Sequence, residues 1–188
     1  MIGVLSVQGN FNNHIQCLNY LNIDCKEIKE PFDLNECSGL IIPGGESSVI
    51  MKMIYDNKLY EPIIRFSKKY AVIGFCAGLI VLSKTAISKQ RPLGILDIEI
   101  ERNSYGSQFH SFSKNIYINS DIQKSVDALF IRAPRITNYN SNIEILATYE
   151  KSPILIRHSK AFGCSFHSEF KLDNPVHRLF INTVYEKN

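Results

Sequence analysis

The chain has 188 residues, 45% of them apolar, which is enough to build the core of a globular protein. Lysine and arginine outnumber aspartate and glutamate by 21 to 18 without a basic run, so nucleic-acid binding is not favoured. No apolar stretch approaches the ~20 residues of a membrane-spanning helix, and Met1–Val7 lacks the basic start of a signal peptide. The five cysteines follow no Cys-x-x-Cys spacing, which predicts reduced thiols and no metal site. We therefore expect one soluble, cytoplasmic domain over residues 1–188, without a membrane partner.

The first half of the chain alternates apolar runs with segments in which apolar residues recur at helical spacing. Because the runs are apolar throughout, they predict buried strands of a parallel sheet that helices cover on both faces. The predicted strands are Ile2–Val7, Ile23–Ile28, Gly39–Ile42 and Ala71–Phe75. The predicted helices are Phe11–Leu21, with Asn10 or Asn12 as its N-cap, then Val49–Tyr55, Leu59–Lys69 and Ala77–Lys84.

Beyond Pro92 the pattern changes. Leu96, Ile98 and Ile100 alternate with acidic residues, which predicts a strand with one wet face. Further strands are expected over Phe109–Asn119, Ala128–Ala133 and Gly163–Phe166, with a hairpin of Ile143–Tyr149 and Ile154–Arg157, and a last helix starting at Asp173-Asn174-Pro175. The whole pattern predicts a three-layer α/β/α sandwich with a mixed, mostly parallel sheet.

Cys76 stands between the apolar run Ala71–Phe75 and the predicted helix that begins at Ala77. Gly74 and Gly78 permit a sharp strand-to-helix turn here, as in the nucleophile elbow of serine hydrolases. The positive end of a helix dipole favours the thiolate of a cysteine at such a turn. A buried structural cysteine fits the local pattern equally well, because free cysteine is among the most buried residue types.

His167 and Glu169 follow the last predicted strand. In extended backbone, side chains two positions apart project to the same side, so Glu169 is able to orient the imidazole of His167. Together with Cys76 they would supply a nucleophile, its base and a carboxylate that orients the base. The remaining histidines are interpreted as ordinary core or surface residues: His14, His110, His158 and His177.

Further candidates lie at the ends of other predicted strands. The backbone N–H groups of Gly44-Gly45, with that of Ala77, are candidates for stabilising an oxyanion, although a tight loop that caps a helix is the simpler interpretation. Arg102 and Arg132 suit either the binding of a carboxylate or a role as solvated charges. Spacing does not decide between these alternatives.

Six motifs occur in order along nearly the whole chain: Val7-Gln8-Gly9, Pro43–Ser47, Gly74–Leu79, Arg102-Asn103, Phe130–Pro134 and Ser165–Glu169. Together they resemble the PdxT-type glutaminase subunits of pyridoxal 5′-phosphate synthase. The elbow and the His-x-Glu motif are shared by triad glutamine amidotransferases in general. The Gly-Gly-Glu-Ser loop, the Arg-Asn pair and the Phe-Ile-Arg-Ala-Pro run point to this family in particular.

The resemblance implies a flavodoxin-like, class I glutamine amidotransferase fold and a glutaminase that needs no cofactor. It would release ammonia from L-glutamine and channel it to a separate synthase subunit. The resemblance implies that Cys76 is the nucleophile, His167 the general base and acid, and Glu169 the orienting carboxylate. The residues that it implies for binding glutamine are Gly45, Glu46, Ser47, Arg102, Ile131 and Arg132. Its oxyanion region is expected at Gly45, Ala77 and, near the synthase interface, Gln8.

Three positions depart from the pattern of the family. Ser168 stands where proline is usual, and because serine is freer in φ we expect Glu169 to be held less rigidly. Phe75 replaces a small or hydroxyl residue before the nucleophile, and we expect changed packing with the chemistry retained. Ser107 replaces an arginine, which bears on the expected loop contacts around Gln108.

Other functions are compatible with parts of the pattern. The chain is alternatively a glutaminase subunit of another synthase, such as one in histidine biosynthesis, or a regulatory subunit that binds glutamine without hydrolysing it. A PfpI-type hydrolase also has a cysteine at an elbow, but it gives no reason for the late His-x-Glu motif. The complete set of Cys76, His167 and Glu169 argues against a regulatory subunit, because a binding module does not need all three.

Overall fold

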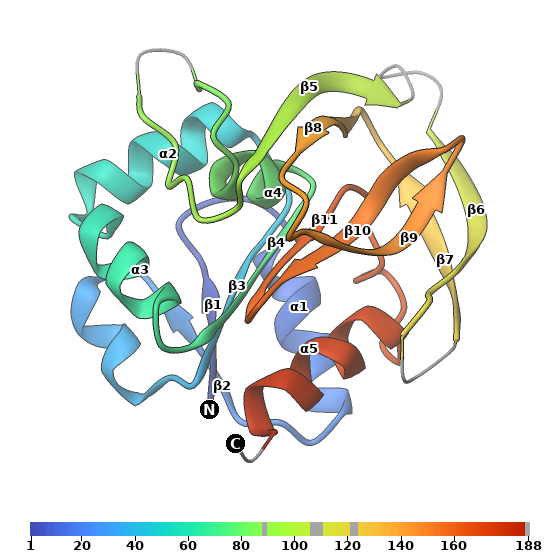
Figure 1. Cartoon of the computed structure of the whole chain (residues 1–188). Helices are drawn as coiled ribbons and strands as arrows, with labels where there is room; N and C mark the ends of the chain where they lie inside the picture. The colour runs from blue at the N-terminus through green and yellow to red at the C-terminus, as the bar shows by residue number, and fades with distance from the viewer. Residues whose placement is uncertain (88–89, 106–110, 121–123, 187–188) are drawn as a thin grey trace.

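A seven-stranded sheet forms the centre of the computed structural model, which describes residues 1–87, 90–105, 111–120 and 124–186 (Figure 1). Its strands are β1 (Ile2–Leu5), β2 (Cys25–Ile28), β3 (Gly39–Ile42), β4 (Ala71–Phe75), β9 (Glu144–Tyr149), β10 (Ser152–His158) and β11 (Ala161–Cys164). They lie in the order β2-β1-β3-β4-β11-β10-β9, in which the first five are parallel and the last two antiparallel. The predicted mixed, mostly parallel sheet is confirmed, as is the β9–β10 hairpin.

Helices cover both faces of this sheet (Figure 1). The helices are α1 (Phe11–Tyr20), α2 (Ser47–Asp56), α3 (Tyr60–Ser67), α4 (Ala77–Leu82) and α5 (Pro175–Tyr185), with a 3-10 helix, η1 (Pro31–Glu36), after β2. α2, α3 and α4 pack in one hydrophobic core, whereas α1 and α5 pack in the other. The predicted three-layer sandwich is confirmed, although η1 was not predicted.

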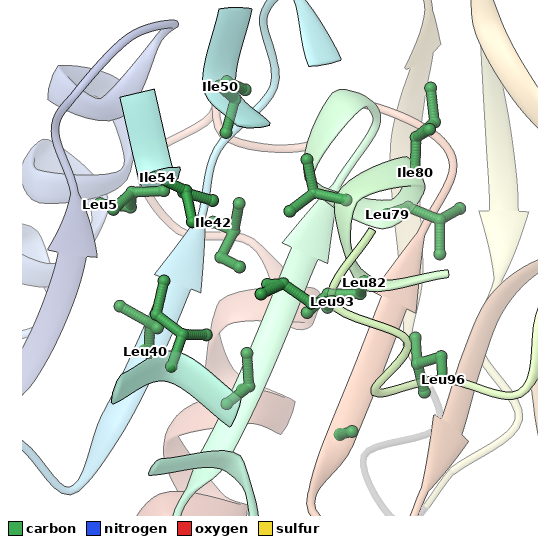
Figure 2. Packing of buried hydrophobic residues seen from close by; sticks show 14 of the residues in the cluster. Leu5, Leu40, Ile42, Ile50, Ile54, Leu79, Ile80, Leu82, Leu93 and Leu96 are labelled. Carbon is green, nitrogen blue, oxygen red and sulfur yellow. The ribbon is translucent and has the colours of Figure 1, made fainter. Parts of the chain in front are cut away.

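The two cores are separated by strands whose side chains alternate between them. Leu40 and Ile42 of β3 belong to the core with α2 and α4, where Figure 2 shows Ile42 beside Ile54, and Ile41 belongs to the core with α1 and α5. All three residues are fully buried. The apolar runs of the sequence therefore reflect strands that are buried on both faces.

Two antiparallel ribbons accompany the main sheet. One pairs β5 (Ile98–Tyr105) with β8 (Ala133–Tyr139), and the other pairs β6 (Phe112–Tyr117) with β7 (Ser125–Phe130). The predicted strand over Ala128–Ala133 is wrong in its bounds, because β7 ends before Ile131 and β8 begins after Arg132. Arg132 has a φ of 45°, a left-handed conformation that a strand does not accommodate.

Several other boundaries differ from the predicted ones by a few residues. The strand predicted over Phe109–Asn119 is present as β6, but Phe109 and His110 lie outside the described residues, as do Ser107 and Gln108. β11 lies two residues before the predicted Gly163–Phe166. Within the described part of the chain, no helix has the length and apolar character needed to cross a membrane.

Candidate active site

Cys76 lies in the turn between β4 and α4, with φ 47° and ψ −100°, a conformation that L-residues rarely adopt. Glycines make this turn possible. A Cβ on Gly74 would lie 2.4 Å from the carbonyl oxygen of Gly78, and a Cβ on Gly78 would lie 2.2 Å from that of Ile42. The N–H of Cys76 donates to the carbonyl of Cys164 at 2.7 Å, which joins the turn to β11. The predicted sharp elbow is confirmed.

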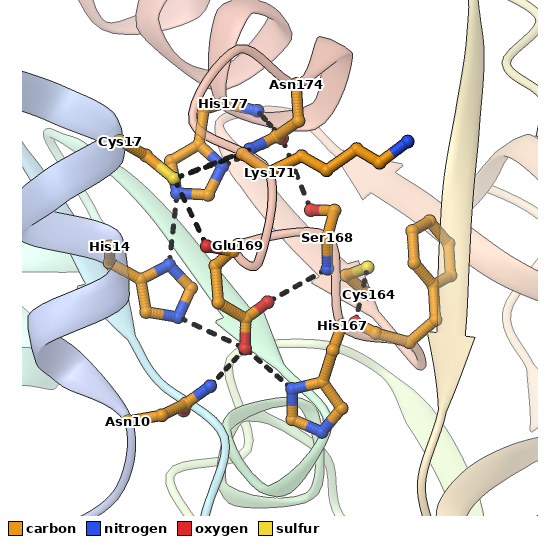
Figure 3. A network of polar contacts seen from close by, with 11 residues as sticks. Asn10, His14, Cys17, Cys164, His167, Ser168, Glu169, Lys171, Asn174 and His177 are labelled. Carbon is orange, nitrogen blue, oxygen red and sulfur yellow. Dashed lines mark hydrogen bonds and ion pairs between the residues drawn. The ribbon is translucent and has the colours of Figure 1, made fainter. Parts of the chain in front are cut away.

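His167 and Glu169 face each other directly after β11. Nδ1 of His167 lies 2.6 Å from Oε1 of Glu169 (Figure 3). The two side chains are buried, and the backbone of His167 exchanges two hydrogen bonds with Leu129 of β7, at 2.8 and 3.0 Å. The expectation that the two side chains project to the same side is confirmed.

The charges of this pair support each other. Burial lowers the pKa of His167, but hydrogen bonds to Cys76 and Glu169 outweigh burial and raise it above the ordinary value. Burial raises the pKa of Glu169, but its hydrogen bond with His167 outweighs burial and lowers it. The imidazole is therefore able to stay protonated beside the carboxylate, an arrangement that suits a base serving a sulfur nucleophile.

The other four cysteines have protonated thiols near neutral pH. Burial is the largest cause that raises the pKa of Cys17, to about 11, and the pKa values of Cys25, Cys37 and Cys164. Among the five cysteines, Cys76 alone lines the cavity that lies in front of His167.

This cavity has a volume of about 450 Å³. Its lining includes the following residues predicted from the sequence: Gln8, Gly45, Glu46, Ser47, Cys76, Ala77, Arg102, Ile131, Arg132 and His167. Glu169 is behind His167 and is only 1% exposed. The structure thus brings every predicted site residue to one place. Within the described residues, no group of three or more His, Cys, Asp or Glu side chains is arranged to hold a metal ion.

The Gly44-Gly45-Glu46 loop forms one wall of the cavity. Gly45 has a φ of 150°, and a Cβ there would lie 2.6 Å from Oε1 of Gln8. The same Gln8 oxygen accepts a hydrogen bond from the N–H of Glu46 at 3.1 Å. Oε1 of Glu46 lies 3.4 Å from Nη2 of Arg102, and both side chains are partly exposed. An anionic and a cationic group therefore stand side by side where an amino-acid ligand would meet them.

Several residues near the carboxylate were missed or misinterpreted. Asn10, predicted as an N-cap, makes no side-chain capping bond and instead donates from Nδ2 to Oε1 of Glu169. The N–H of Ser168, a donor that proline lacks, donates to Oε2 at 2.9 Å, so the expectation that Ser168 weakens the hold on Glu169 is wrong. Ile80 and Phe170, which no pattern singled out, also line the cavity.

Behind Glu169, the ring of Phe75 packs against two buried histidines. Its centroid lies 4.6 Å from that of His14 and 5.4 Å from that of His177. Phe75 therefore packs against the histidine whose Nε2 lies 3.9 Å from Oε1 of Glu169. His14 and His177 are core residues, as interpreted, but they contact the site from α1 and α5, more than 150 residues apart in sequence.

Comparisons with known proteins identify relatives of this chain. The relatives named pyridoxal 5′-phosphate synthase subunit PdxT include those of Thermosipho africanus and Francisella philomiragia. That of Thermosipho africanus is 41% identical over 185 residues, covering 97% of this chain and 98% of the relative. That of Francisella philomiragia is 37% identical over 181 residues, covering 96% and 97%.

Solved structures show the same fold. A crystal structure described as a glutamine amidotransferase matches with a TM-score of 0.91 at 33% identity, covering 97% of this chain and 98% of that one. The structure of PurLQS from Thermotoga maritima, at 13% identity and a TM-score of 0.70 over 98% and 94% of the two chains, shares the fold alone. Residues 4–186 match the family model described as SNO glutamine amidotransferase. Since this match spans nearly the whole length, the chain belongs to the SNO glutamine amidotransferase family.

Proposed function

We propose that this glutamine amidotransferase hydrolyses L-glutamine through Cys76, His167 and Glu169, and that the ammonia serves the synthesis of pyridoxal 5′-phosphate. The observation that carries the proposal is the hydrogen-bonded His167–Glu169 pair beside an elbow cysteine at the cavity. The relatives named PdxT, which align over nearly their full length, support the choice of pathway.

The first half-reaction is acyl transfer to sulfur. The thiolate of Cys76 attacks the side-chain amide carbon of glutamine, and backbone N–H groups near Gly45 and Ala77 stabilise the charge that develops on oxygen. As the tetrahedral intermediate collapses, the carbon–nitrogen bond breaks and His167 gives its proton to the leaving nitrogen. Ammonia departs and a glutamyl thioester remains on Cys76.

The second half-reaction is hydrolysis of this thioester. His167, now neutral, takes a proton from water as the water oxygen attacks the thioester carbon. The carbon–sulfur bond breaks, glutamate leaves, and the thiolate and the imidazolium are restored. Glu169 accepts the hydrogen bond from Nδ1 throughout and stabilises the imidazolium whenever it forms.

The cavity wall offers groups that match the two ends of an amino acid. We assign Arg102 and Arg132 to the α-carboxylate, because a guanidinium binds a carboxylate through paired donors. Glu46 is assigned to the ammonium group of the substrate. Ser47 and Ile131 complete the pocket on either side.

The relatives are named as subunits of a synthase, so we propose that this chain docks on a synthase subunit and passes ammonia directly to it. We further propose that residues 1–188 act as one glutaminase domain in the cytoplasm. The second candidate, a glutaminase that serves another synthase, differs from the first only in this partner.

A nitrogen-source experiment tests the function. Pyridoxal 5′-phosphate formation is measured with the matching synthase subunit and either glutamine or an ammonium salt, for the wild type and Cys76→Ser. We expect Cys76→Ser to lose the glutamine-dependent reaction and keep the ammonium-dependent one. Glutamine hydrolysis that survives in Cys76→Ser would exclude the mechanism. Hydrolysis by the wild type without any pyridoxal 5′-phosphate would point to another synthase.

A further inference from the structure

The carboxylate of Glu169 has more hydrogen-bond donors than the triad itself provides. Oε1 accepts from Nδ1 of His167 and from Nδ2 of Asn10, whereas Oε2 accepts from the backbone N–H of Ser168 at 2.9 Å (Figure 3). Asn10 precedes α1, and Ser168 lies between the two triad residues. Both carboxylate oxygens are therefore held by hydrogen bonds, and one donor to Oε1, Asn10, is 159 residues away in the sequence.

A nearby histidine does not contribute to this set of donors. Nε2 of His14 lies 3.9 Å from Oε1 of Glu169, which is beyond hydrogen-bond distance. Burial lowers the pKa of His14 to about 4 and that of His177 to about 3, so both rings are neutral near pH 7. A neutral imidazole carries a hydrogen on one nitrogen only, and its tautomer decides what it presents to Glu169.

Asn174 fixes both tautomers. Its Oδ1 accepts from the backbone N–H of His177 at 3.0 Å, and its Nδ2 donates to the carbonyl of Lys171 at 3.0 Å, which sets the orientation of the amide. Oδ1 also lies 2.9 Å from Nδ1 of His177, so Nδ1 carries the hydrogen and Nε2 is bare. Nδ1 of His14, 3.0 Å from that bare nitrogen, must then donate. The Nε2 of His14 that faces Glu169 is left with a lone pair.

We propose that Asn10 is a positioning residue, which together with the backbone N–H of Ser168 holds the two oxygens of Glu169 and through them orients the imidazole of His167. The inference rests on the proposed function of the triad. A buried carboxylate with one donor is free to rotate about its last torsion, because His14 offers no hydrogen bond on that side. Three donors from three directions fix the oxygen that His167 uses, and small misplacements of a catalytic group are costly.

Asn10, which itself lines the cavity, is also hydrogen-bonded to the Gly44-Gly45-Glu46 loop. Its backbone N–H donates to the carbonyl of Gly44 at 3.2 Å. The same residue thus joins the loop expected to stabilise the oxyanion to the carboxylate of the triad. A loss of activity on replacing Asn10 could therefore arise from its contact with Glu169 or from its contact with Gly44. Measuring the same replacement in a variant without the Glu169 carboxylate distinguishes the two.

The positioning residue has a matched control. Asn10→Leu removes the donor at nearly constant size, Asn10→Ala is a second variant without it, and Asn12→Ala replaces an exposed asparagine on α1. We expect kcat for glutamine hydrolysis, measured with the synthase subunit, to fall ~10-fold in Asn10→Leu and Asn10→Ala, with KM within about twofold. Asn12→Ala should retain kcat.

Repeating the two Asn10 changes in Glu169→Ala shows whether they act through the carboxylate. Residues that work through Glu169 have no further effect once it is gone, so kcat should then change by less than about twofold. An unchanged kcat in the single variants, or an equal fall in the Glu169→Ala background, would overturn the proposal. Failure of the proposed function itself looks different, because wild type and Cys76→Ser would then hydrolyse glutamine alike.

Discussion

Gly44 and His167 are in close contact at the cavity: a Cβ at position 44 would lie 2.4 Å from Cε1 of the imidazole and 3.2 Å from Nδ1. The loop expected to stabilise the oxyanion is therefore also the surface against which the base rests. A hydrogen atom fits in this contact, whereas a methyl group does not.

Gly44→Ala should displace the imidazole and reduce kcat by on the order of 10-fold or more, because a misplaced base transfers protons poorly. Gly94→Ala is the control. Gly94 has a φ of 65° and open space around its Cβ position, so its replacement should cost about 1 kcal/mol of stability and leave kcat unchanged. Kinetics and thermal unfolding of both variants check this, and equal kcat values would show that the contact is not needed.

Replacement of Cys76 should separate chemistry from stability. Cys76→Ala and Cys76→Gly should both abolish glutamine hydrolysis. Because φ at this position is 47°, the glycine variant should be more stable than the alanine variant by about 1 kcal/mol, contrary to the usual effect of glycine. Denaturant unfolding measures the difference. A more stable alanine variant would mean that the elbow relaxes when sulfur is removed.

His167→Asn should be nearly as damaging as the loss of the nucleophile, because the two groups act as a unit. General acid–base catalysis usually contributes ~10²–10⁴-fold, so a loss below ~10-fold would contradict the assignment of the base. His158→Asn, a half-buried histidine of β10, is the matched control and should keep full activity. Steady-state glutaminase kinetics with the synthase subunit give both numbers.

Arg102→Gln should act on binding. The guanidinium lines the cavity beside Glu46, and removing a charged contact to the substrate carboxylate should raise KM by roughly 10-fold or more. Arg157→Gln, which breaks an ion pair with Glu144 at 2.7 Å away from the cavity, should leave KM unchanged. A fall in kcat at constant KM would instead give Arg102 a role in the transition state.

The buried histidines predict how stability depends on pH. In the folded chain, His14 and His177 take up protons only at about pH 4 and about pH 3, because burial disfavours their charged forms. In the unfolded chain they do so near pH ~6.5. The unfolded state therefore binds more protons between these values, and the free energy of unfolding falls as pH decreases from about 6.5 towards 4.

His177→Gln should flatten this slope relative to the wild type. Denaturant unfolding at several pH values between 4 and 7.5 measures the slope for each variant, with buffers of equal ionic strength. The same slope in the wild type and in His177→Gln would show that the buried pair takes no part in the linkage.

Much of the fold could be predicted because its central strands are local apolar runs. Gly39–Ile42 and Ala71–Phe75 have the bounds that the sequence predicted. The helix start at Asn174 was also predictable, since its side chain caps the N–H of His177, within three residues. By contrast, β8 was not predicted as a separate strand, because nothing local marks the left-handed turn at Arg132.

The candidate site shows the same division between local and distant contacts. Its lining was predictable because the carboxyl ends of parallel strands meet at one edge of a sheet, and because the motifs resemble a known family. The partners of Glu169 were not. Asn10 has the residue type of a helix cap, but its hydrogen-bond partner lies 159 residues away in the chain. A local pattern contains no information about such a pair.

The two backbone hydrogen bonds between His167 and Leu129 connect the main chain of the β6–β7 ribbon to that of His167. Beyond Phe130 the chain turns through Ile131 and Arg132, which stand in the cavity wall. A ligand seated at this turn, or a protein bound to the ribbon, would therefore lie one pair of main-chain hydrogen bonds away from His167. The main chain of His167 is tied to the ribbon without a flexible side chain in between.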